Sequence, residues 1–256
     1  MLKIATWNVN SLRVRLPQVL DWLTVNTPDI VALQEIKMTN EQFPLEAIQA
    51  AGYKAIFSGQ KTYNGVALLS RQEGSDIITD LPNFDDPQRR VLGATYGDLR
   101  VLNLYVPNGA TLDSDKYEYK LSWLMYLHEY IRKTLKTHPR IIVLGDFNIA
   151  PEDCDLYNPA AWKGKVIASP AERTALQNLL DLGLRDTFRL FDQAPESFSW
   201  WDYRAGSFRR NQGIRIDLIL ASTTLSADCT KCEIDLAPRG LERPSDHTPV
   251  VATFNI

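Results

Sequence analysis

The sequence predicts an α/β protein in which two β-sheets pack face to face and helices cover the outside. Short apolar strand-like runs recur through all 256 residues, and only a few helix-like stretches separate them. No linker, composition break or fixed-period repeat divides the chain, so residues 1–256 are expected to form one domain. With 45% hydrophobic residues the chain has ample side chains for a core. Many strands and few helices favour sheet-on-sheet packing.

Each predicted strand is a short run rich in apolar and β-branched residues, bounded by turn residues. The strands expected are Lys3–Asn8, Ile30–Gln34, Tyr53–Ser58, Val66–Ser70, Val91–Tyr96, Arg100–Tyr105, Arg140–Leu144, Ile214–Ala221 and Val250–Phe254. Gly97 and Asp98 lie between two of these runs and predict a hairpin turn.

The helices are predicted from apolar residues that recur every three or four positions. Leu16–Val25 and Lys116–Leu135 have this spacing. A third helix is expected to begin after Ser169, because a cap residue is followed by Pro170 and by Glu172 in the capping-box position. It should run to about Leu182, with Gly183 as the stop.

The composition excludes several classes of protein. No apolar run is long enough to span a bilayer, and the N-terminus lacks the plan of a signal peptide, so a cytoplasmic location is expected. The net charge of −3 gives no global support for nucleic-acid binding, so any polyanion site must be a local basic patch. Candidates are Arg13 with Arg15, Lys61, Arg89 with Arg90, Lys163 with Lys165, and Arg204 with Arg209 and Arg210.

The three cysteines indicate neither a disulfide framework nor a metal site. Cys229 and Cys232 have C-x-x-C spacing, but a zinc site needs a second ligand pair. Only Cys154 and three scattered histidines remain to supply one. No thioredoxin-like unit surrounds the motif, so a redox role is not expected either.

Polar residues end the strand at residues 140–144, where a core would need none. Asp146 and Asn148 are two positions apart, and alternate residues of an extended chain project to the same side. A charge at the rim of a core is costly unless it is paired, hydrogen-bonded or bound to metal. A partner is therefore expected opposite Asp146.

Other strand ends supply the same residue types. Asn8 with Asn10, Glu35, and Asp246 with His247 each lie next to a predicted strand. Each alone is more often a turn or cap residue, but their recurrence at strand ends of one sandwich predicts a cluster. Asp217 is expected inside its strand, where it needs a partner, and His247 is the obvious one.

The residue types narrow the chemistry. Carboxylates and carboxamides suit Mg²⁺ or Mn²⁺. A histidine backed by a buried aspartate suits general acid–base or electrostatic catalysis. A hard cation with these groups suits phosphoryl chemistry. No GxxxxGK[ST] loop is present, so no nucleotide cofactor is expected.

The motifs resemble those of a known superfamily. The chain resembles the endonuclease/exonuclease/phosphatase superfamily at Trp7–Asn10, Gln34–Glu35, Gly145–Asn148 and Ser245–His247. It resembles the exonuclease III branch of that superfamily, the class II abasic-site (AP) endonucleases, at Leu33–Lys37, Tyr105–Gly109, Phe198–Arg204 and Gly213–Asp217. The match runs along the whole chain. It implies a four-layer, DNase I-like α/β sandwich of two mixed sheets flanked by helices, with the site at one edge.

The resemblance also implies roles for the clustered residues. Glu35 would hold the metal, Mg²⁺ with Mn²⁺ as the alternative, helped by Asn8, Asn10 or Asp246, and Asp146 and Asn148 are further candidate metal residues. Asp146 would orient or deprotonate water, the general base staying open between Asp146 and the Asp217–His247 pair. Asn148 and His247 would contact the scissile phosphate, with Tyr105 and Asn108 near it. The remaining DNA contacts would come from Lys37, Asn64, Trp200, Trp201, Ile214 and Ile216, three of which (Trp200, Ile214 and Ile216) would form a pocket for a base-less sugar.

The implied function is a Mg²⁺-dependent DNA repair hydrolase that acts as a monomer on damaged double-stranded DNA. It would cut 5′ to abasic sites and remove nucleotides or blocking groups from 3′ ends. The alternatives are a family member that acts on 3′ ends only, a phosphatase or phospholipase of the same superfamily, and a DNA-binding module with an inactive site. Ordinary core packing is the alternative for Trp200 and Trp201.

Overall fold

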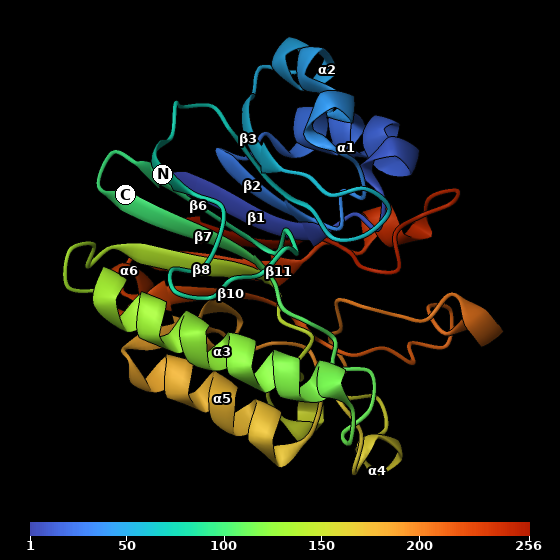
Figure 1. The fold of residues 1–256 in the computed structure, drawn as a ribbon. Coiled ribbons are helices and arrows are strands. Elements are labelled where there is room, and N and C mark those ends of the chain that lie inside the picture. Colours follow the sequence, from blue (N-terminus) through green and yellow to red (C-terminus); the bar gives the residue numbers. More distant parts are fainter.

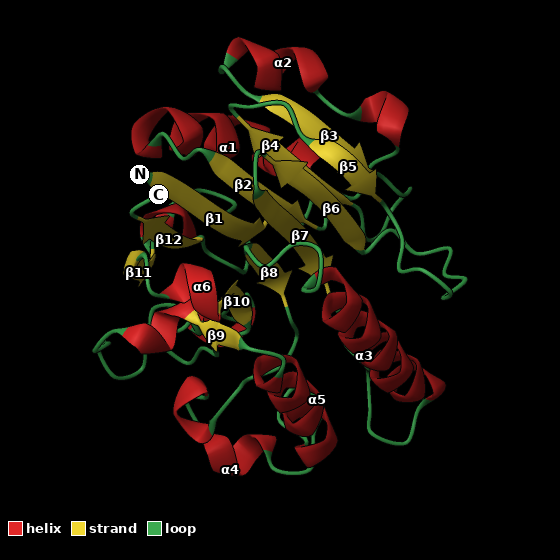
Figure 2. Ribbon diagram, turned by 90° about the vertical axis from the view of Figure 1, so that its left-hand side faces the viewer, coloured by secondary structure: helices red, strands yellow, loops and turns green.

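The computed structural model describes residues 1–256 as four layers, with helices on both outer faces of two packed β-sheets. Figure 2 shows α1 and α2 over the first sheet, and α3 and α5 lie together on the outer side of the second. The predicted fold class is therefore confirmed. None of the helices has the length and apolar character needed to traverse a bilayer.

Both sheets have six strands and are mixed, because each contains one parallel pair. The first sheet has the order β11-β12-β1-β2-β4-β3, and β1 pairs with β2 in parallel. Its strands, in that order, are Cys229–Ile234, Val250–Phe254, Leu2–Asn8, Ile30–Gln34, Val66–Ser70 and Lys54–Ser58. The second has the order β5-β6-β7-β8-β10-β9, and β7 pairs with β8 in parallel. Its strands are Ser75–Ile78, Val91–Tyr96, Leu99–Tyr105, Ile141–Asp146, Asp217–Ser222 and Leu184–Asp186.

Six α-helices and five 3₁₀ turns connect the strands. The helices α1 to α6 are Leu12–Asn26, Leu45–Ala50, Asp115–Thr134, Pro159–Trp162, Pro170–Asp181 and Thr223–Ser226. The 3₁₀ turns are Asn40–Gln42, Asp153–Asp155, Thr187–Leu190, Arg204–Gly206 and Ala237–Gly240. The capping box predicted at Ser169 is present, and Gly183 follows α5 with a φ of 98°. Helix α1 begins at Leu12, four residues before the predicted start, and Pro17 lies inside it.

Three apolar cores correspond to the three interfaces between layers. The largest lies between the sheets and includes Ile4 and Leu68 from one and Leu144 and Ile219 from the other. A second packs the outer face of the second sheet against α3 and α5, and a third packs the first sheet against α1 and α2. Burial of these side chains is the main stabilising term, at about 25 cal/mol per Å² of apolar surface.

The sequence missed three strands, and all of them lie at sheet edges. β5, β9 and β11 are short or largely exposed, so they lack the apolar pattern that marks an interior strand. The strand predicted at 214–221 was placed too early, because it begins at Asp217 and ends at Ser222. The strand predicted at 140–144 ends later, so Asp146 is its last residue. Asp217 is thus at a strand end and not in a strand interior.

The sheet register brings three site residues into one row. Asp146 of β8 lies opposite Tyr105 of β7 on one side and Asp217 of β10 on the other. Residues paired across neighbouring strands point to the same face of a sheet. All three side chains therefore project toward the first sheet, at the edge where β1 and β2 end at Asn8 and Gln34.

Candidate active site

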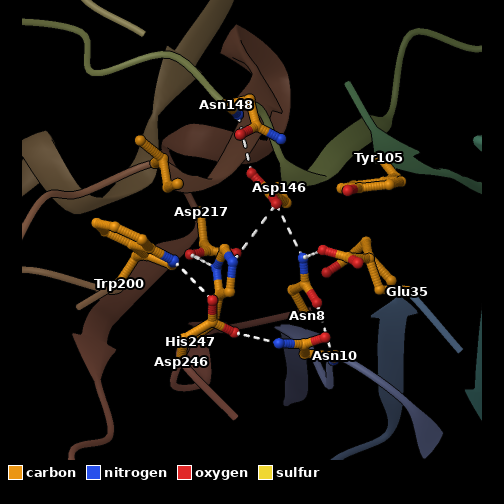
Figure 3. A network of polar contacts seen from close by, with 12 residues as sticks. Asn8, Asn10, Glu35, Tyr105, Asp146, Asn148, Trp200, Asp217, Asp246 and His247 are labelled. Atoms are coloured by element: carbon orange, nitrogen blue, oxygen red, sulfur yellow. Dashed lines mark hydrogen bonds and ion pairs between the residues drawn. The ribbon is translucent and has the colours of Figure 1, made fainter. Parts of the chain in front are cut away.

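Asn8 joins the two sheets at this edge. Its side-chain nitrogen donates to Glu35 Oε1 at 2.8 Å and to Asp146 Oδ2 at 2.9 Å (Figure 3). Asn8 and Asp146 are both almost completely buried. A shared amide donor holds two carboxylates near each other although they would otherwise repel. The predicted convergence of Asn8, Glu35 and Asp146 is confirmed.

A tight turn, and not an extended strand, brings Asn148 to the site. Asn148 has a φ of 49°, and its backbone N–H donates to Asp146 Oδ1 at 2.9 Å. Asparagine tolerates this left-handed conformation better than most residues. Asp146 and Asn148 are therefore not related by the alternation of an extended chain that was predicted, although both side chains reach the site. The Asn148 amide is fixed further by Val106 O and by Asn108 Nδ2, each at 3.0 Å.

His247 lies between two aspartates. Its Nδ1 donates to Asp217 Oδ2 at 2.9 Å, and its Nε2 faces Asp146 Oδ2 at 3.7 Å. The predicted Asp217–His247 pair is confirmed. Asp217 Oδ1 has no hydrogen-bond partner and is buried, so the carboxylate depends on Oδ2 contacts for its stabilisation.

Two serines that the sequence analysis did not single out support this pair. Ser199 Oγ donates to Asp217 Oδ2 at 2.7 Å and accepts the N–H groups of Ile216 and Asp217. Ser245 Oγ donates to the carbonyl of Asn8 at 2.7 Å and accepts the N–H of His247 at 3.2 Å. Ser199 directly precedes Trp200 and Ser245 directly precedes Asp246, so their positions within the two motifs could have indicated a role at the site.

Burial opposes ionisation of the Asp146 carboxyl, whereas the neighbouring carboxylates favour the protonated form of His247. Burial raises the pKa of Asp146 to about 7. Burial alone would lower the pKa of His247, but the charges of Asp217 and Asp146 outweigh it and raise that pKa to about 10. His247 is therefore a cation at neutral pH.

Tyr105 and Glu35 form the opposite wall. Burial, together with the charges of Glu35 and Asp146, raises the pKa of Tyr105 well above its ordinary value, so its hydroxyl stays a donor. Glu35 Oε2 pairs with Lys37 Nζ at 2.8 Å. Glu35 and Lys37 both have positive φ angles, 51° and 52°, a strained backbone of the kind that functional sites retain.

The donor set fits a hard divalent cation. Glu35, Asp146 and His247 offer ligand atoms that all lie within 4.8 Å of one another. His247 is protonated, so the two carboxylates are the better ligands. A cation between them would offset the cost of burying Asp146 as an anion. Asn8 presents its amide nitrogen here, while its Oδ1 accepts the N–H of Asn10.

Asp246 and Asn10 lie beside this cluster and are engaged with other groups. Asp246 accepts from Asn10 Nδ2 at 2.9 Å and from Trp200 Nε1 at 3.0 Å (Figure 3). Burial opposes ionisation of Asp246, but the charge of His247 and these hydrogen bonds outweigh it and lower its pKa. Asp246 thus stays ionised and adds to the negative charge facing the site.

A polar cavity opens next to Tyr105. It has a volume of about 490 Å³, and its lining includes the predicted residues Asn64 and Asn108 together with Arg90 and Lys116. Arg90 stacks over the Tyr105 ring with its guanidinium carbon 4.6 Å from the centroid. Of the candidate basic residues predicted from the sequence, only Arg90 lines this cavity, and Arg89 next to it pairs with Asp80.

An apolar cluster lies on the other side of Asn148. Ile214 and Ile216 are buried in it, and the partly exposed Trp200 packs against it. Trp201 is separate. It is buried, packs edge-on against Phe208 and donates to Asn211, so its contacts are those of core packing.

Replacing Asp217 with asparagine is expected to lower the pKa of His247 by at least about one unit, because a neutral amide no longer stabilises the imidazolium. In the wild type, protonation of His247 contributes its full stabilisation below about pH 6.5, and this contribution is lost as the pH rises through about 10. The stability that the variant loses relative to the wild type should therefore be largest at pH values below the lowered pKa of its His247. NMR titration of the imidazoles measures this, with His128 and His138 as internal references. An unchanged His247 titration would show that Asp217 does not hold the charge.

Comparisons with known proteins agree with this geometry. A model of the Endonuclease/Exonuclease/phosphatase family matches residues 5–247. Exodeoxyribonuclease III from Haemophilus influenzae is 38% identical, and the alignment covers 99% of this chain and all of that protein. A Neisseria 3′ phosphatase, solved as a D146N variant with a product DNA hairpin, is 48% identical with a TM-score of 0.98 over the full length of both chains. An AP endonuclease from Archaeoglobus fulgidus is 40% identical with a TM-score of 0.97, again over both full chains.

The two sheets, the row of site residues and these full-length similarities lead to one conclusion. The chain belongs to the endonuclease/exonuclease/phosphatase family, in the branch of exodeoxyribonuclease III and the AP endonucleases.

Proposed function

We propose that this chain is a Mg²⁺- or Mn²⁺-dependent DNA repair hydrolase. Its substrates would be the phosphodiester 5′ to an abasic site and the blocked or normal 3′ ends of double-stranded DNA. The observation that carries the proposal is the convergence of Glu35, Asp146 and His247 within 4.8 Å beside a cavity lined by Arg90 and Lys116. The names of the relatives support it, since they include an exodeoxyribonuclease, a 3′ phosphatase with product DNA and an AP endonuclease.

In this proposal each residue has a separate task. A cation held by Glu35 and Asp146 would supply neutralisation of charge on the reacting phosphate. Asp146 orients the attacking water and accepts its proton, because His247 is already protonated and its Nδ1 is bound to Asp217. As the water oxygen bonds to phosphorus, the bond from phosphorus to the 3′ oxygen breaks, and a cation at Glu35 would offset the charge on that leaving oxygen until it takes up a proton as the 3′-hydroxyl. His247 and the Asn148 amide stabilise negative charge as it develops on the phosphate oxygens. The Tyr105 hydroxyl, on the opposite wall, stays protonated and would donate a hydrogen bond to the phosphate.

Substrate selection follows from the two flanking surfaces. The polar cavity would hold the DNA backbone through Arg90, Lys116 and Asn64, whereas Trp200 and the apolar cluster around Ile214 would receive a sugar without a base. A flipped abasic sugar offers no base to hydrogen-bond, so an apolar pocket too small for a full nucleotide gives selectivity.

Three matched duplexes test this function in the presence of Mg²⁺. They carry an internal tetrahydrofuran abasic mimic, a 3′-phosphate and an undamaged recessed 3′ end. We expect hydrolysis of all three, with kcat/KM values for the two damaged substrates above that for the recessed end. Activity on 3′ ends alone would restrict the function to end processing. Turnover of a phosphoinositide without any cleavage of DNA would contradict the proposal.

A further inference from the structure

A buried ion pair lies directly behind the site, between α3 and α5, which run side by side outside the second sheet (Figure 1). Lys120 Nζ and Glu172 Oε1 are 2.5 Å apart, and both side chains are fully buried. Removing two charges from water costs several kcal/mol per ion, and a well-packed apolar pair is often equally stable. Stability alone therefore gives little reason for this pair.

The ammonium group of Lys120 connects two loops of the site. It donates to Asn148 O at 2.7 Å and to Asn108 O at 3.1 Å, and its third proton goes to Glu172. An ammonium has three donors, so its capacity is used completely. The side chains of Asn108 and Asn148 are themselves hydrogen-bonded at 3.0 Å. Lys120 thus fixes the main chain behind both amides of that pair.

Glu172 connects a third loop to the same point. Its Oε1 also accepts the N–H of Ile167 at 2.9 Å, and its Oε2 accepts the N–H of Ser169 at 3.1 Å. Ile167 has a φ of 78°, which is costly for a β-branched residue and persists only where surrounding contacts enforce it. Ile167 belongs to the apolar cluster that contains Ile214 and Ile216.

The Asn108 loop is shaped to lie on Lys120. Gly109 has a φ of 97°, and a Cβ at this position would lie 3.3 Å from Lys120 Cδ and from Tyr117 Cδ2. Glycine therefore allows the loop to approach the lysine stem closely enough for the Asn108 carbonyl to accept its hydrogen bond.

We propose that Lys120 is a positioning residue that aligns the Asn108–Asn148 amide pair with the reacting phosphate, and that Glu172 holds Lys120 and the loop at residues 165–169 in place. This inference depends on the proposed function, because it assumes that Asn148 contacts the phosphate. Lys120 touches no substrate itself and acts through the main chain of the two asparagines.

The test is the double substitution Lys120→Met/Glu172→Met, which removes both charges together and leaves neither ion unpaired. We expect kcat on the abasic or 3′-phosphate duplex to fall roughly 10- to 100-fold while KM changes less than about threefold, because alignment matters most in the transition state. Glu172→Gln is the milder second variant, since it keeps an oxygen toward Lys120; its kcat should fall by less than that of the double variant but by at least about threefold.

Arg100→Met is the matched control. Arg100 is also buried, and it donates to Asp76 O, Thr95 Oγ1 and Tyr130 OH on the far part of β7. This variant should lose thermal stability to a similar degree and keep the wild-type kcat. A general loss of rigidity would lower kcat in both.

A double-mutant cycle with Asn148→Ala separates positioning from simple structural support. If Lys120 acts through Asn148, the Lys120 and Glu172 substitutions should lower kcat less than about threefold further in the Asn148→Ala background. Full additivity, or wild-type kcat in both folded variants, overturns the inference. Absence of activity in the wild-type protein would instead refute the proposed function, so the two failures are distinguishable.

Discussion

Replacing Asp146 with asparagine is expected to lower kcat on a damaged duplex by about 10³-fold or more, on the scale seen when a catalytic carboxylate becomes an amide. Asparagine has the same shape but does not accept a proton from water and binds a cation weakly. The two asparagines that contact Asp146, Asn8 and Asn148, present donors to it and not bases, so they do not replace it. Steady-state kinetics on the 3′-phosphate and tetrahydrofuran duplexes measure the effect.

The same variant should be more stable than the wild type when no metal is present. Burial raises the pKa of Asp146 to about 7, so its ionised form destabilises the fold. This cost in folding free energy is absent below about pH 4, the pKa of an aspartate in the unfolded chain. It grows as the pH rises to about 7, the pKa in the folded protein, and is constant above that. At pH 8 the variant should melt at least about 3 °C higher, and at pH 4 the two should melt together. Mg²⁺ should raise the wild-type Tm more than that of the variant.

Retained activity in a folded Asp146→Asn protein would show that the catalytic centre lies elsewhere. A lower melting temperature at pH 8 without metal would show that Asp146 is not a strained anion. These two outcomes are independent, since one concerns the chemistry and the other concerns the environment of the carboxylate.

Replacing Glu35 with glutamine is expected to raise the Mg²⁺ concentration needed for half-maximal rate by at least about 100-fold. The substitution removes one of the two carboxylates that fit the cation, and even outer contacts of a metal site are worth 10- to 100-fold in affinity. The amide still fits the space beside Asn8, so the fold should be retained. Mg²⁺ titrations of both the rate and the melting temperature measure the change.

Glu73→Gln is a suitable control for Glu35. Glu73 also pairs with a lysine, Lys54, but on the exposed surface, where such pairs contribute little. This variant should keep the wild-type Mg²⁺ dependence. A Glu35→Gln protein with unchanged Mg²⁺ dependence would place the metal at other ligands, for which Asp246, beside the cluster, is a candidate carboxylate.

The interior strands and the polar cluster were predictable from the sequence because their signals are local. Val91–Tyr96 and Val250–Phe254 are buried almost throughout and consist mostly of apolar residues, and their predicted bounds agree with the structure. Asp146 and His247 were recognisable because charged residues beside such runs are costly without partners. Their convergence then required only that the strand ends meet at one edge of the sandwich.

The parts that were missed depend on contacts between distant segments. β5, β9 and β11 are strands because of their neighbours, and their own sequences are polar or short. The turn at Asn148 arises from a side-chain acceptor on Asp146, which overrides the extended geometry.

The position of Lys120 in the sequence could have predicted its burial, although it was not singled out. It lies on the buried stripe of α3 with Leu124, Leu127 and Ile131, at helical spacing, although lysine is rarely fully buried. A charge on an apolar stripe predicts a buried partner. The identity of that partner, Glu172 on another helix, could come only from the fold.

The central claim is that a divalent cation at Glu35 and Asp146 is required for cleavage of damaged DNA. The most direct measurement incubates the wild-type protein with a duplex that carries one tetrahydrofuran site, either with Mg²⁺ or with EDTA. We predict cleavage 5′ to the site with Mg²⁺, none with EDTA, and recovery when Mg²⁺ is restored in excess. Cleavage that persists in EDTA, or no hydrolysis of either this duplex or the 3′-phosphate duplex with Mg²⁺ in a protein whose melting curve shows that it is folded, would contradict the claim.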